Sequence, residues 1–271
     1  MRLSEAVRLL SESGIAEAKH DARALFSHFG GASPVDLTVG DPECGSEELV
    51  SAIKRRAERV PLQYIIGRTW FYREEYEVSE SCLIPRQDTE ILVDYAVRNI
   101  PKGERFLDLC TGSGCIGIST LVNTEGTSAV LVDISGEALA IAGRNAERNG
   151  VSERAELLRL DVMRECAEGE YFAVLSNPPY VSDKAYSELE DEIFHEPRIA
   201  FVGGDDGADF YRHLTPIYKE KIKKNGFIAY EIGYDQADIL RDVAASCGMT
   251  AEIIRDLSGN DRVAVLKNAE Q

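Results

Sequence analysis

The sequence lacks any apolar run near the roughly 18 residues that a membrane-spanning helix needs. Its N-terminal segment, MRLSEAVRLLSESG, carries acidic residues within the apolar pattern and has no compact apolar block before a small-residue cleavage site, which argues against a signal peptide. Internal repeats and low-complexity tracts are also missing. These absences favour a cytoplasmic protein that does not contact a membrane.

Clustered metal ligands are missing as well. The six cysteines form no CxxC pair and the four histidines are equally dispersed, whereas a metal centre needs its ligands close together. We therefore expect no metal, and we expect reduced thiols as in a cytosolic protein. The cysteines are Cys44, Cys82, Cys110, Cys115, Cys166 and Cys247.

Positive charge is scarce. The formal net charge is −17, and the first 60 residues contribute only −2 of it, with eight Lys/Arg against ten Asp/Glu. Nucleic-acid binding draws most of its affinity from clustered cations that neutralise phosphates. Because the rest of the chain is so acidic, it is poorly suited to hold a duplex, and we expect no direct nucleic-acid partner.

The chain of 271 residues is long enough for one large and one small domain. Apolar residues at helical spacing mark three segments, of which the second stops at Gly30-Gly31 and the third follows Ser46 and closes at Pro61. We predict a small helical domain over residues 1–60. The basic side chains of its third segment form either a solvated face or a face that docks a partner: Lys54, Arg55, Arg56 and Arg59.

Residues 61–85 are rich in aromatic and β-branched residues, which predicts a β-hairpin linker in which Trp70 and Phe71 pack against the adjoining domain. From residue 86 to 271, helical segments alternate with short apolar strands, which favours an α/β domain with a doubly wound, mostly parallel sheet. The last two strands suit an antiparallel hairpin at the sheet edge. The seven strand candidates are 105–109, 128–132, 155–160, 172–176, 227–232, 250–255 and 262–266.

A glycine turn follows the first of these strands, in RFLDLCTGSGCIGIS. Gly112, Gly114 and Gly117 satisfy the GxGxxG pattern of dinucleotide-binding proteins, so a nicotinamide-dependent oxidoreductase is one candidate. Asp108 argues against it, because an acid at the strand end repels a pyrophosphate but favours a positively charged sulfonium ligand with a free amino group. The structural alternative is that Asp108 caps the turn.

Two more acids end the next two strands. Asp133, in AVLVDIS, can accept hydrogen bonds from both ribose hydroxyls of a nucleoside, which NAD and S-adenosylmethionine share. Asp161, in LLRLDVM, stands where methyltransferases contact the adenine amino group, and Val162 can pack on the adenine ring. Either acid can instead cap a helix.

The tetrapeptide Asn177-Pro178-Pro179-Tyr180, directly after a strand, is the most specific signal. Two consecutive prolines have no backbone N–H and a fixed φ, so the turn presents only carbonyl oxygens. A planar NH2 group can donate one hydrogen to the Asn177 side chain and one to the Pro178 carbonyl, while Tyr180 stacks on its π-system. A rigid turn without a ligand is the alternative interpretation.

Such a turn suits methyl transfer to nitrogen. The lone pair of an amide or aromatic amine is delocalised, so the nitrogen is a poor nucleophile. Two acceptors orient the group toward a methyl donor and stabilise the positive charge that develops on nitrogen. We therefore predict an S-adenosylmethionine-dependent methyltransferase that acts on a planar NH2 group, with Asn177, Pro178 and Tyr180 carrying catalysis.

These motifs, in this order, resemble the peptide chain release factor N(5)-glutamine methyltransferases, the HemK/PrmC family. The sequence NPPY is shared with DNA and RNA amino-methyltransferases, whereas the linker and the Gly-Gly-Asp-Asp-Gly segment are more specific to the family. The likeness spans nearly the whole chain through PLQYIIG at 61–67, LIPRQDTE at 83–90, DLCTGSGCIGI, Asp133, NPPY, EPRIAFVGGDDG at 196–207, EIGYDQ at 231–236 and DLSGNDRV at 256–263.

The resemblance implies a helical N-terminal domain that helps to recognise the release factor, and a class I, Rossmann-like methyltransferase domain with a seven-stranded sheet. The implied reaction methylates the glutamine of the Gly-Gly-Gln motif of release factors, modulates translation termination and leaves S-adenosylhomocysteine. Residues 177–180 would hold that glutamine. The cofactor would contact Cys110, Thr111, Gly112, Ser113, Gly114, Asp133, Asp161, Val162 and Asn177.

Two positions depart from the family pattern. Cys110 stands where many relatives have glycine. Val162 stands where many have tryptophan, which weakens the expected packing on adenine.

Several alternatives stay open. A nucleic-acid amino-methyltransferase would use the same NPPY chemistry but predicts a basic channel, an oxidoreductase leaves NPPY unexplained, and a non-catalytic module would keep the pocket without the transfer. Arg86 either lines the cofactor pocket or orders the linker, or else pairs with Asp88 or Glu90. Segments 196–198 and 203–207 form either a loop that closes over the substrate or plain surface.

Overall fold

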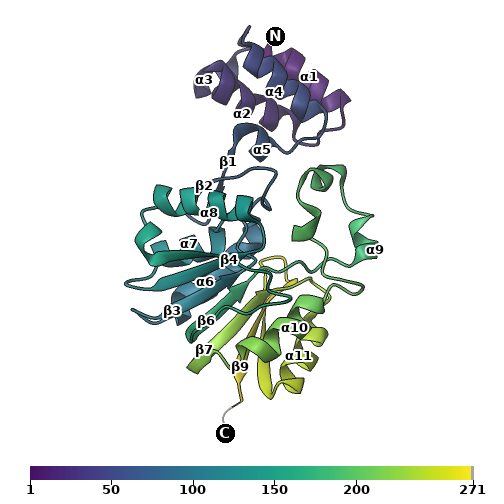
Figure 1. Ribbon diagram of the computed structural model, residues 1–271. Helices are drawn as coiled ribbons and strands as arrows, with labels where there is room; N and C mark the ends of the chain where they lie inside the picture. Colours follow the sequence, from purple (N-terminus) through teal and green to yellow (C-terminus); the bar gives the residue numbers. More distant parts are fainter. Residues whose placement is uncertain (270–271) are drawn as a thin grey trace. The chain divides into compact units, whose positions relative to one another are not determined.

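The computed structural model describes residues 1–269, which divide into two compact units (Figure 1). Unit 1 comprises residues 1–68 together with 190–195, and unit 2 comprises 69–189 and the chain from 196 onward. Unit 1 therefore extends past the helical domain predicted for 1–60 and takes in a short segment from much later in the chain. Within the described residues, no helix is both long and apolar enough to cross a membrane.

Three helices of unit 1 correspond to the predicted segments: α1 (Leu3–Glu12), α2 (Ala18–Gly30) and α4 (Glu47–Ala57). Gly31 ends α2 with a left-handed φ of +63°, and the Ser46 side chain accepts a hydrogen bond from the Leu49 backbone N–H at the start of α4. The apolar faces of the three helices pack together. The buried side chains there include Leu10, Leu25, Phe26, Leu49 and Ile53.

Arg56, on α4, belongs neither to a solvated face nor to a free docking face. It is 5% exposed, and its guanidinium donates to Asp21 Oδ2 and to Glu192 Oε1, each at 2.7 Å. Both carboxylates lie within unit 1. The helical pattern placed Arg56 among the polar residues of α4, but its buried partners come from α2 and from the distant segment 190–195.

Two short helices lie outside the sequence predictions. In α3 (Pro34–Val39), Ser33 accepts from the Asp36 N–H and proline occupies the first turn. In α5 (Leu62–Ile66), the helix follows Pro61 and ends at Gly67, whose φ is +80°. The hairpin predicted over 61–85 is accordingly shorter, with strands β1 (Arg68–Phe71) and β2 (Glu74–Glu77).

The two aromatic residues of β1 behave differently. Phe71 is buried and packs edge-to-face on Tyr76, with ring centroids 6.0 Å apart. Trp70 is 72% exposed, so the expectation that it packs against the domain is wrong. Successive side chains of a strand point to opposite faces, and only one face of this hairpin is covered.

Unit 2 contains a seven-stranded sheet in the order β5-β4-β3-β6-β7-β9-β8. The first five strands in that order are parallel, and β7, β9 and β8 pair antiparallel. The predicted parallel-rich sheet with an antiparallel edge hairpin is confirmed. The strands are β3 (Arg105–Leu109), β4 (Ser128–Asp133), β5 (Ala155–Arg159), β6 (Tyr171–Ser176), β7 (Ile222–Glu231), β8 (Met249–Arg255) and β9 (Asp261–Asn268).

Helices cover both faces of this sheet (Figure 1). The central strands are apolar on both sides: Phe106 of β3 joins the core under one group of helices, and the next residue, Leu107, joins the core under the other. The first group is α6 (Glu90–Asn99), α7 (Cys115–Val122) and α8 (Gly136–Arg148), and the second is α10 (Asp209–Tyr218) and α11 (Ala237–Ser246). The remaining short helices are η1 (Gln87–Thr89), η2 (Ser152–Arg154), α9 (Asp183–Tyr186), η3 (Asp191–His195) and η4 (Arg198–Ala200).

The order of the strands in the sheet predicts where a ligand site lies. The chain runs outward from β3 to β4 and β5 on one side, and returns to β6 and β7 on the other. In doubly wound sheets, the crevice at the carboxyl ends of the strands where this order reverses is the usual ligand site. Here that point lies between β3 and β6, whose following turns carry the glycines and the NPPY sequence.

Candidate active site

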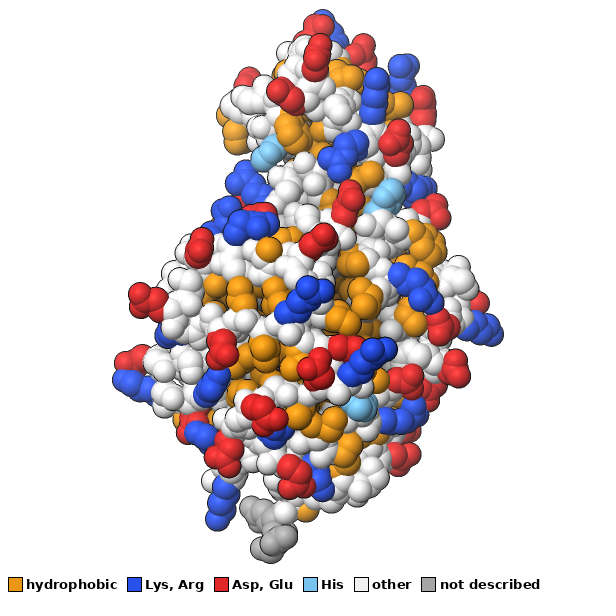
Figure 2. Space-filling view, in the orientation of Figure 1, with side chains coloured by type: hydrophobic (Ala, Val, Ile, Leu, Met, Phe, Trp, Pro, Cys, Tyr) orange, Lys and Arg blue, Asp and Glu red, His pale blue; other side chains and the backbone are white. Residues whose placement is uncertain are grey.

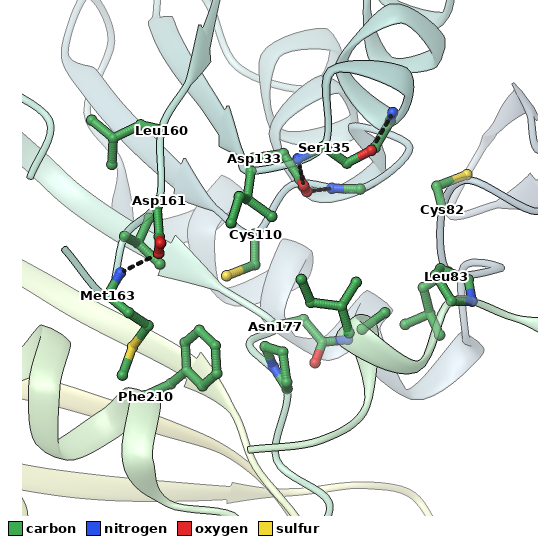
Figure 3. A pocket seen from close by; sticks show the side chains of 18 of the residues that line it. Cys82, Leu83, Cys110, Asp133, Ser135, Leu160, Asp161, Met163, Asn177 and Phe210 are labelled. Carbon is green, nitrogen blue, oxygen red and sulfur yellow. Dashed lines mark hydrogen bonds between the residues drawn. The ribbon is translucent and has the colours of Figure 1, made fainter. Parts of the chain in front are cut away.

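A cavity of about 380 Å³ lies at the carboxyl ends of these strands, within unit 2. Its size falls in the range of small-molecule sites. Figure 3 shows Asp133, Asp161, Asn177 and Phe210 around one space. The predicted site residues that line it are Cys110, Gly112, Asp133, Asp161, Val162, Asn177 and Pro179. A smaller adjoining cavity, of about 30 Å³, is lined by the predicted residues Thr111 and Ser113 and shares Cys110, Gly112 and Asn177.

The glycine turn between β3 and α7 needs glycine for different reasons at each position. Gly112 has a left-handed φ of +55° and faces open space. A Cβ on Gly114 would lie 2.6 Å from Ile118 Cδ1, and one on Gly117 would lie 2.2 Å from Leu131 Cδ2. Gly114 and Gly117 thus allow α7 to pack closely, and a direct contact of Gly114 with the cofactor stays a prediction.

Asp108 occupies the position at the start of α7 where a dinucleotide would place its pyrophosphate. Its Oδ2 accepts hydrogen bonds from the Gly117 N–H at 2.9 Å and the Thr111 hydroxyl at 2.5 Å. Complete burial raises the pKa of the Asp108 carboxyl to about 7, although these two bonds act in the opposite direction. Because the protein's own carboxylate takes the helix N-terminus, a second anion there is unfavourable, which argues against nicotinamide dinucleotide binding.

Asp133 ties the ends of β3 and β4 together. Its Oδ2 accepts from the Gly112 N–H at 2.8 Å and its Oδ1 from the Ser135 N–H at 2.9 Å (Figure 3). Burial raises the pKa of the Asp133 carboxyl. Each oxygen keeps a further lone pair, so the side chain can still accept bonds from a ligand in the cavity. Asp133 is not the N-cap of α8, because Ser135 holds that position.

Asp161 and Val162 lie on the cavity wall across from residues 177–180. Asp161 Oδ1 accepts from the Met163 N–H at 3.0 Å, which holds a tight turn after β5, and no helix follows within 161–170. Val162 is 6% exposed and lines the cavity with Leu160 and Met163. These positions fit an apolar slot with one acid at its edge.

Cys110 has a φ of +56°, in the left-handed region that favours glycine. The Cys110 sulfur points into the space between the labelled residues of Figure 3. Burial raises the pKa of its thiol strongly, so the group is a neutral apolar wall and not a nucleophile.

The acceptor turn, residues 177–180, follows β6. Asn177 and Pro179 line the main cavity, and the Tyr180 hydroxyl donates to Glu231 Oε1 at 3.1 Å. The segment after it is fixed by Val181, which exchanges backbone bonds with Phe201 and Gly203 at 2.8 and 2.9 Å. The turn is therefore held on a second layer of backbone rather than exposed as a free loop.

Two glycines of the Gly-Gly-Asp-Asp-Gly segment make that layer possible. A Cβ on Gly203 would lie 2.2 Å from the Pro179 carbonyl oxygen, and one on Gly207 would lie 2.1 Å from the Tyr180 carbonyl oxygen. The Gln236 side chain also donates to the Tyr180 carbonyl, at 2.9 Å. Residues 203–207 thus support the turn from behind.

Sequence reasoning missed several wall residues. Phe210, from α10, and Leu83, from the segment before α6, both line the cavity, as do Ile199 and Ala200. Pro197, from segment 196–198 that the sequence offered as a closing loop, lines it too. Of the alternatives for Arg86, pairing with Asp88 or Glu90 is not the one found among the described residues: its side chain pairs with Glu196, and the residue lines the smaller cavity. Glu196 is 6% exposed and also accepts from the Ile84 N–H at 3.0 Å. This carboxylate joins segment 84–86 to the loop that supplies the wall, a link of 110 residues that no local pattern signals.

Comparisons with known proteins identify the fold and the family of the chain. Two family models match the chain, the PrmC N-terminal domain over residues 2–67 and the methyltransferase small domain over 87–203. The chain is 35% identical to the release factor glutamine methyltransferase of Caulobacter vibrioides and 35% identical to that of Geobacter sulfurreducens. Each alignment covers 94% of this chain and 91% of the relative. A solved methyltransferase from Pyrococcus furiosus is similar in fold, with a TM-score of 0.53 at 18% identity over 70% of this chain and 86% of that one.

The sheet order, the glycine turn and the cavity at the reversal of strand order define a class I methyltransferase fold. Two relatives at 35% identity, each aligned over nearly the whole chain, narrow that class to one family. The chain belongs to the release factor glutamine methyltransferase family. The fold class and the family resemblance expected from the motifs are both confirmed.

Proposed function

We propose that this chain transfers a methyl group from S-adenosylmethionine to the side-chain amide nitrogen of the glutamine in the Gly-Gly-Gln motif of peptide chain release factors. The products are the methylated release factor and S-adenosylhomocysteine, and the modification modulates translation termination in the cytoplasm. The observation that best supports this is the shared cavity: Asn177 and Pro179 line it together with Gly112, Asp133 and Asp161.

The cofactor side of the cavity fits a cationic nucleoside. A Cβ built on Gly112 meets nothing within 4 Å, so the turn leaves room for a ligand. Within residues 1–269, Asp108 Oδ1 is buried and has no hydrogen-bond partner, which suits a positively charged amino group. Asp133 would accept from the ribose hydroxyls, and Asp161 and Val162 would hold the adenine. When bound, S-adenosylmethionine supplies an electrophilic methyl group on a sulfonium.

The acceptor turn orients the substrate carboxamide. Among the described residues, no protein donor bonds to Asn177 Oδ1 or to the Pro178 carbonyl oxygen. Both are therefore available to accept the two hydrogens of a carboxamide NH2, while Tyr180 would stack on its plane. Holding the nitrogen in line with the methyl group replaces a random encounter by a fixed geometry, an effect of several kcal/mol. The same acceptors stabilise the positive charge that forms on nitrogen.

A nucleic-acid substrate fits the surface poorly. On the face drawn in Figure 2, acidic and basic side chains are interspersed, and the chain carries a net charge of −17. Strand phosphates need a basic channel near the reacting base. An acidic surface instead suits encounter with a basic protein partner, because complementary charge speeds association.

Mass spectrometry of a purified release factor, incubated with this protein and S-adenosylmethionine, tests the proposal. We expect a gain of one methyl group on the Gly-Gly-Gln glutamine, lost in the variant Asn177→Ala. Asn99→Ala is the matched control, because Asn99 is exposed at the end of α6 and its side chain donates to the Tyr95 carbonyl. Methylation of DNA or RNA with none of the release factor would contradict the proposal.

A further inference from the structure

Glu231, the last residue of β7, is a buried carboxylate directly behind the acceptor turn. It is 2% exposed, and its two oxygens have different partners. Oε2 accepts from the Thr89 hydroxyl at 2.5 Å, and Oε1 accepts from the Tyr180 hydroxyl at 3.1 Å. A carboxylate at this depth is costly unless it is bonded, so its contacts to this turn need an explanation.

The Thr89 hydroxyl connects Glu231 to Asn177. Thr89 is 2% exposed, and the Asn177 Nδ2 amide lies 3.4 Å from its oxygen. An ionised carboxylate can only accept hydrogen bonds, so the single hydroxyl hydrogen of Thr89 must go to Glu231. The Thr89 oxygen can then only accept, and the group it accepts from is the NH2 of Asn177.

This direction of donation determines which end of the Asn177 amide faces the cavity. An asparagine side chain can present either its oxygen or its NH2 after a rotation of 180°, and the hydrogen-bond network decides between them. With NH2 turned toward Thr89, the Oδ1 atom is turned away from it and is available to a substrate. The opposite orientation would set an NH2 group against a substrate NH2 group, two donors facing each other.

We propose that Glu231 and Thr89 are positioning residues that set the polarity of Asn177, so that the acceptor turn shows an oxygen and not an NH2 group to the substrate. The proposal rests on the proposed function, because it assumes an acceptor with hydrogens to donate. Glu231 acts on the other end of the turn as well, since its second oxygen takes the Tyr180 hydroxyl hydrogen and fixes that ring. Neither oxygen of Glu231 reaches the cavity, so the residue acts through Thr89, Asn177 and Tyr180.

Groups around Glu231 act on its carboxyl in both directions. Burial, the largest cause, and the negative charge of Asp88 raise the pKa of Glu231, whereas the bonds from Thr89 and Tyr180 and the positive charge of Arg262 lower it. Arg262 is itself shared with Asp88 at 3.1 Å and Asp256 at 3.3 Å. The geometry carries the proposal: both oxygens of Glu231 accept, one from Thr89 and one from Tyr180, and this chain from Glu231 through Thr89 to Asn177 is called the relay below.

A pair of substitutions at Thr89 separates the relay from simple packing. Thr89→Val keeps the shape but removes the hydroxyl, and Thr89→Ser keeps the hydroxyl. We expect Thr89→Val to lower kcat for release-factor methylation about tenfold or more while the affinity for S-adenosylhomocysteine, measured by calorimetry, changes by less than about twofold. Thr89→Ser should restore most of kcat. Equal activity of the Val and Ser variants would overturn the proposal.

Glu231→Gln tests the other end of the relay. A glutamine can donate to Thr89, which frees the Thr89 hydrogen for Asn177 Oδ1 and reverses the amide. We expect a loss of kcat similar to that of Thr89→Val, and no further loss when the two are combined, because both break one chain of bonds. Glu74→Gln is the matched control: Glu74 is also a buried carboxylate, bonded to Ser119 and Asn123 away from the cavity. An equal loss of kcat in the control at equal melting temperature would contradict the proposal.

An arm without turnover separates this inference from the proposed function. In protein labelled with 15N-asparagine, the Asn177 NH2 signal, assigned from its absence in Asn177→Ala, should exchange with solvent more slowly in the parent protein than in Thr89→Val. Slow exchange in the parent that is lost in Thr89→Val supports the relay even if the release factor is not methylated. Unchanged exchange refutes the relay even if the release factor is methylated.

Discussion

The two sides of the cavity are held in different ways. On the cofactor side, the carboxylates bond to groups nearer in the chain. Asp108 bonds to residues three and nine positions away, and Asp133 bonds to Gly112, 21 positions away. On the acceptor side, Asn177 contacts Thr89 across 88 positions and Tyr180 contacts Glu231 across 51. The cofactor side is built from local turns, whereas the acceptor side depends on the assembled tertiary structure.

Because the two sides are held differently, substitutions on each side should have different effects. Changes on the cofactor side should alter ligand affinity or the charge state of one carboxylate, and leave the acceptor turn in place. Changes behind the acceptor turn should lower kcat with little change in cofactor binding.

The largest effect concerns the pH dependence of stability at Asp108. Its folded-state pKa of about 7 lies above the unfolded value, so the folded protein holds this proton where the unfolded chain has lost it. The Asp108 contribution to the free energy of unfolding is thus complete below pH about 4 and declines until pH about 7, by on the order of 4 kcal/mol. Asp108→Asn should remove this decline, measured by urea unfolding across that range.

Asp206 gives a control of opposite sign. The hydrogen bond from Arg212 lowers the pKa of the Asp206 carboxyl to about 2, so its contribution is present above pH about 4 and is lost as the pH falls toward 2. Asp206→Asn should therefore remove this fall between pH about 4 and 2, and leave the slope between pH 4 and 7 unchanged. If Asp108→Asn leaves the slope between pH 4 and 7 unchanged, the raised pKa of the Asp108 carboxyl is wrong.

Gly207→Ala should act on the acceptor side. The new Cβ would lie 2.1 Å from the Tyr180 carbonyl oxygen, so the turn must shift. We expect kcat to fall roughly 100-fold, about 2.7 kcal/mol, while S-adenosylhomocysteine binds within about threefold of the parent value. Gly150→Ala is the matched control, because Gly150 has a similar φ of +70° but open space around it. Equal losses of kcat in the two variants would show that backbone strain, and not the clash, is responsible.

Asp133→Asn should act on the cofactor side. An amide can still accept from the Gly112 N–H but offers weaker acceptance to two ribose hydroxyls, a loss of about 2 kcal/mol, or roughly 30-fold in affinity. The KM for S-adenosylmethionine should rise accordingly, while kcat at saturation falls much less. Calorimetry with S-adenosylhomocysteine measures this, with Asp94→Asn, at a half-buried position on α6, as control. A fall in kcat at unchanged affinity would remove the distinction between the two sides.

The same distinction explains what the sequence could predict. The sequence predicts the strands, the glycine turn, Asp133 and the NPPY turn. These features are recognised from the spacing of apolar residues, from turn-forming residues and from the order of motifs along the chain. Glu231, Thr89 and Phe210 are not visible in this way, because their roles depend on which strands and helices meet in space. The short helix α3 is a different case: Ser33, Pro34 and Asp36 form a recognisable helix start that the apolar pattern alone did not reveal.

The smallest effect concerns Val162, which lines the cavity. Val162→Ala removes two methyl groups from a side chain that is 6% exposed. The loss of contact with adenine should cost about 1 kcal/mol, roughly a fivefold weaker affinity for S-adenosylhomocysteine, with kcat unchanged. Val35→Ala, on the exposed surface of α3, is the control. If adenosine competes with S-adenosylhomocysteine equally well in Val162→Ala and Val35→Ala, adenine does not lie against Val162. It would then lie against Leu160 and Met163 instead.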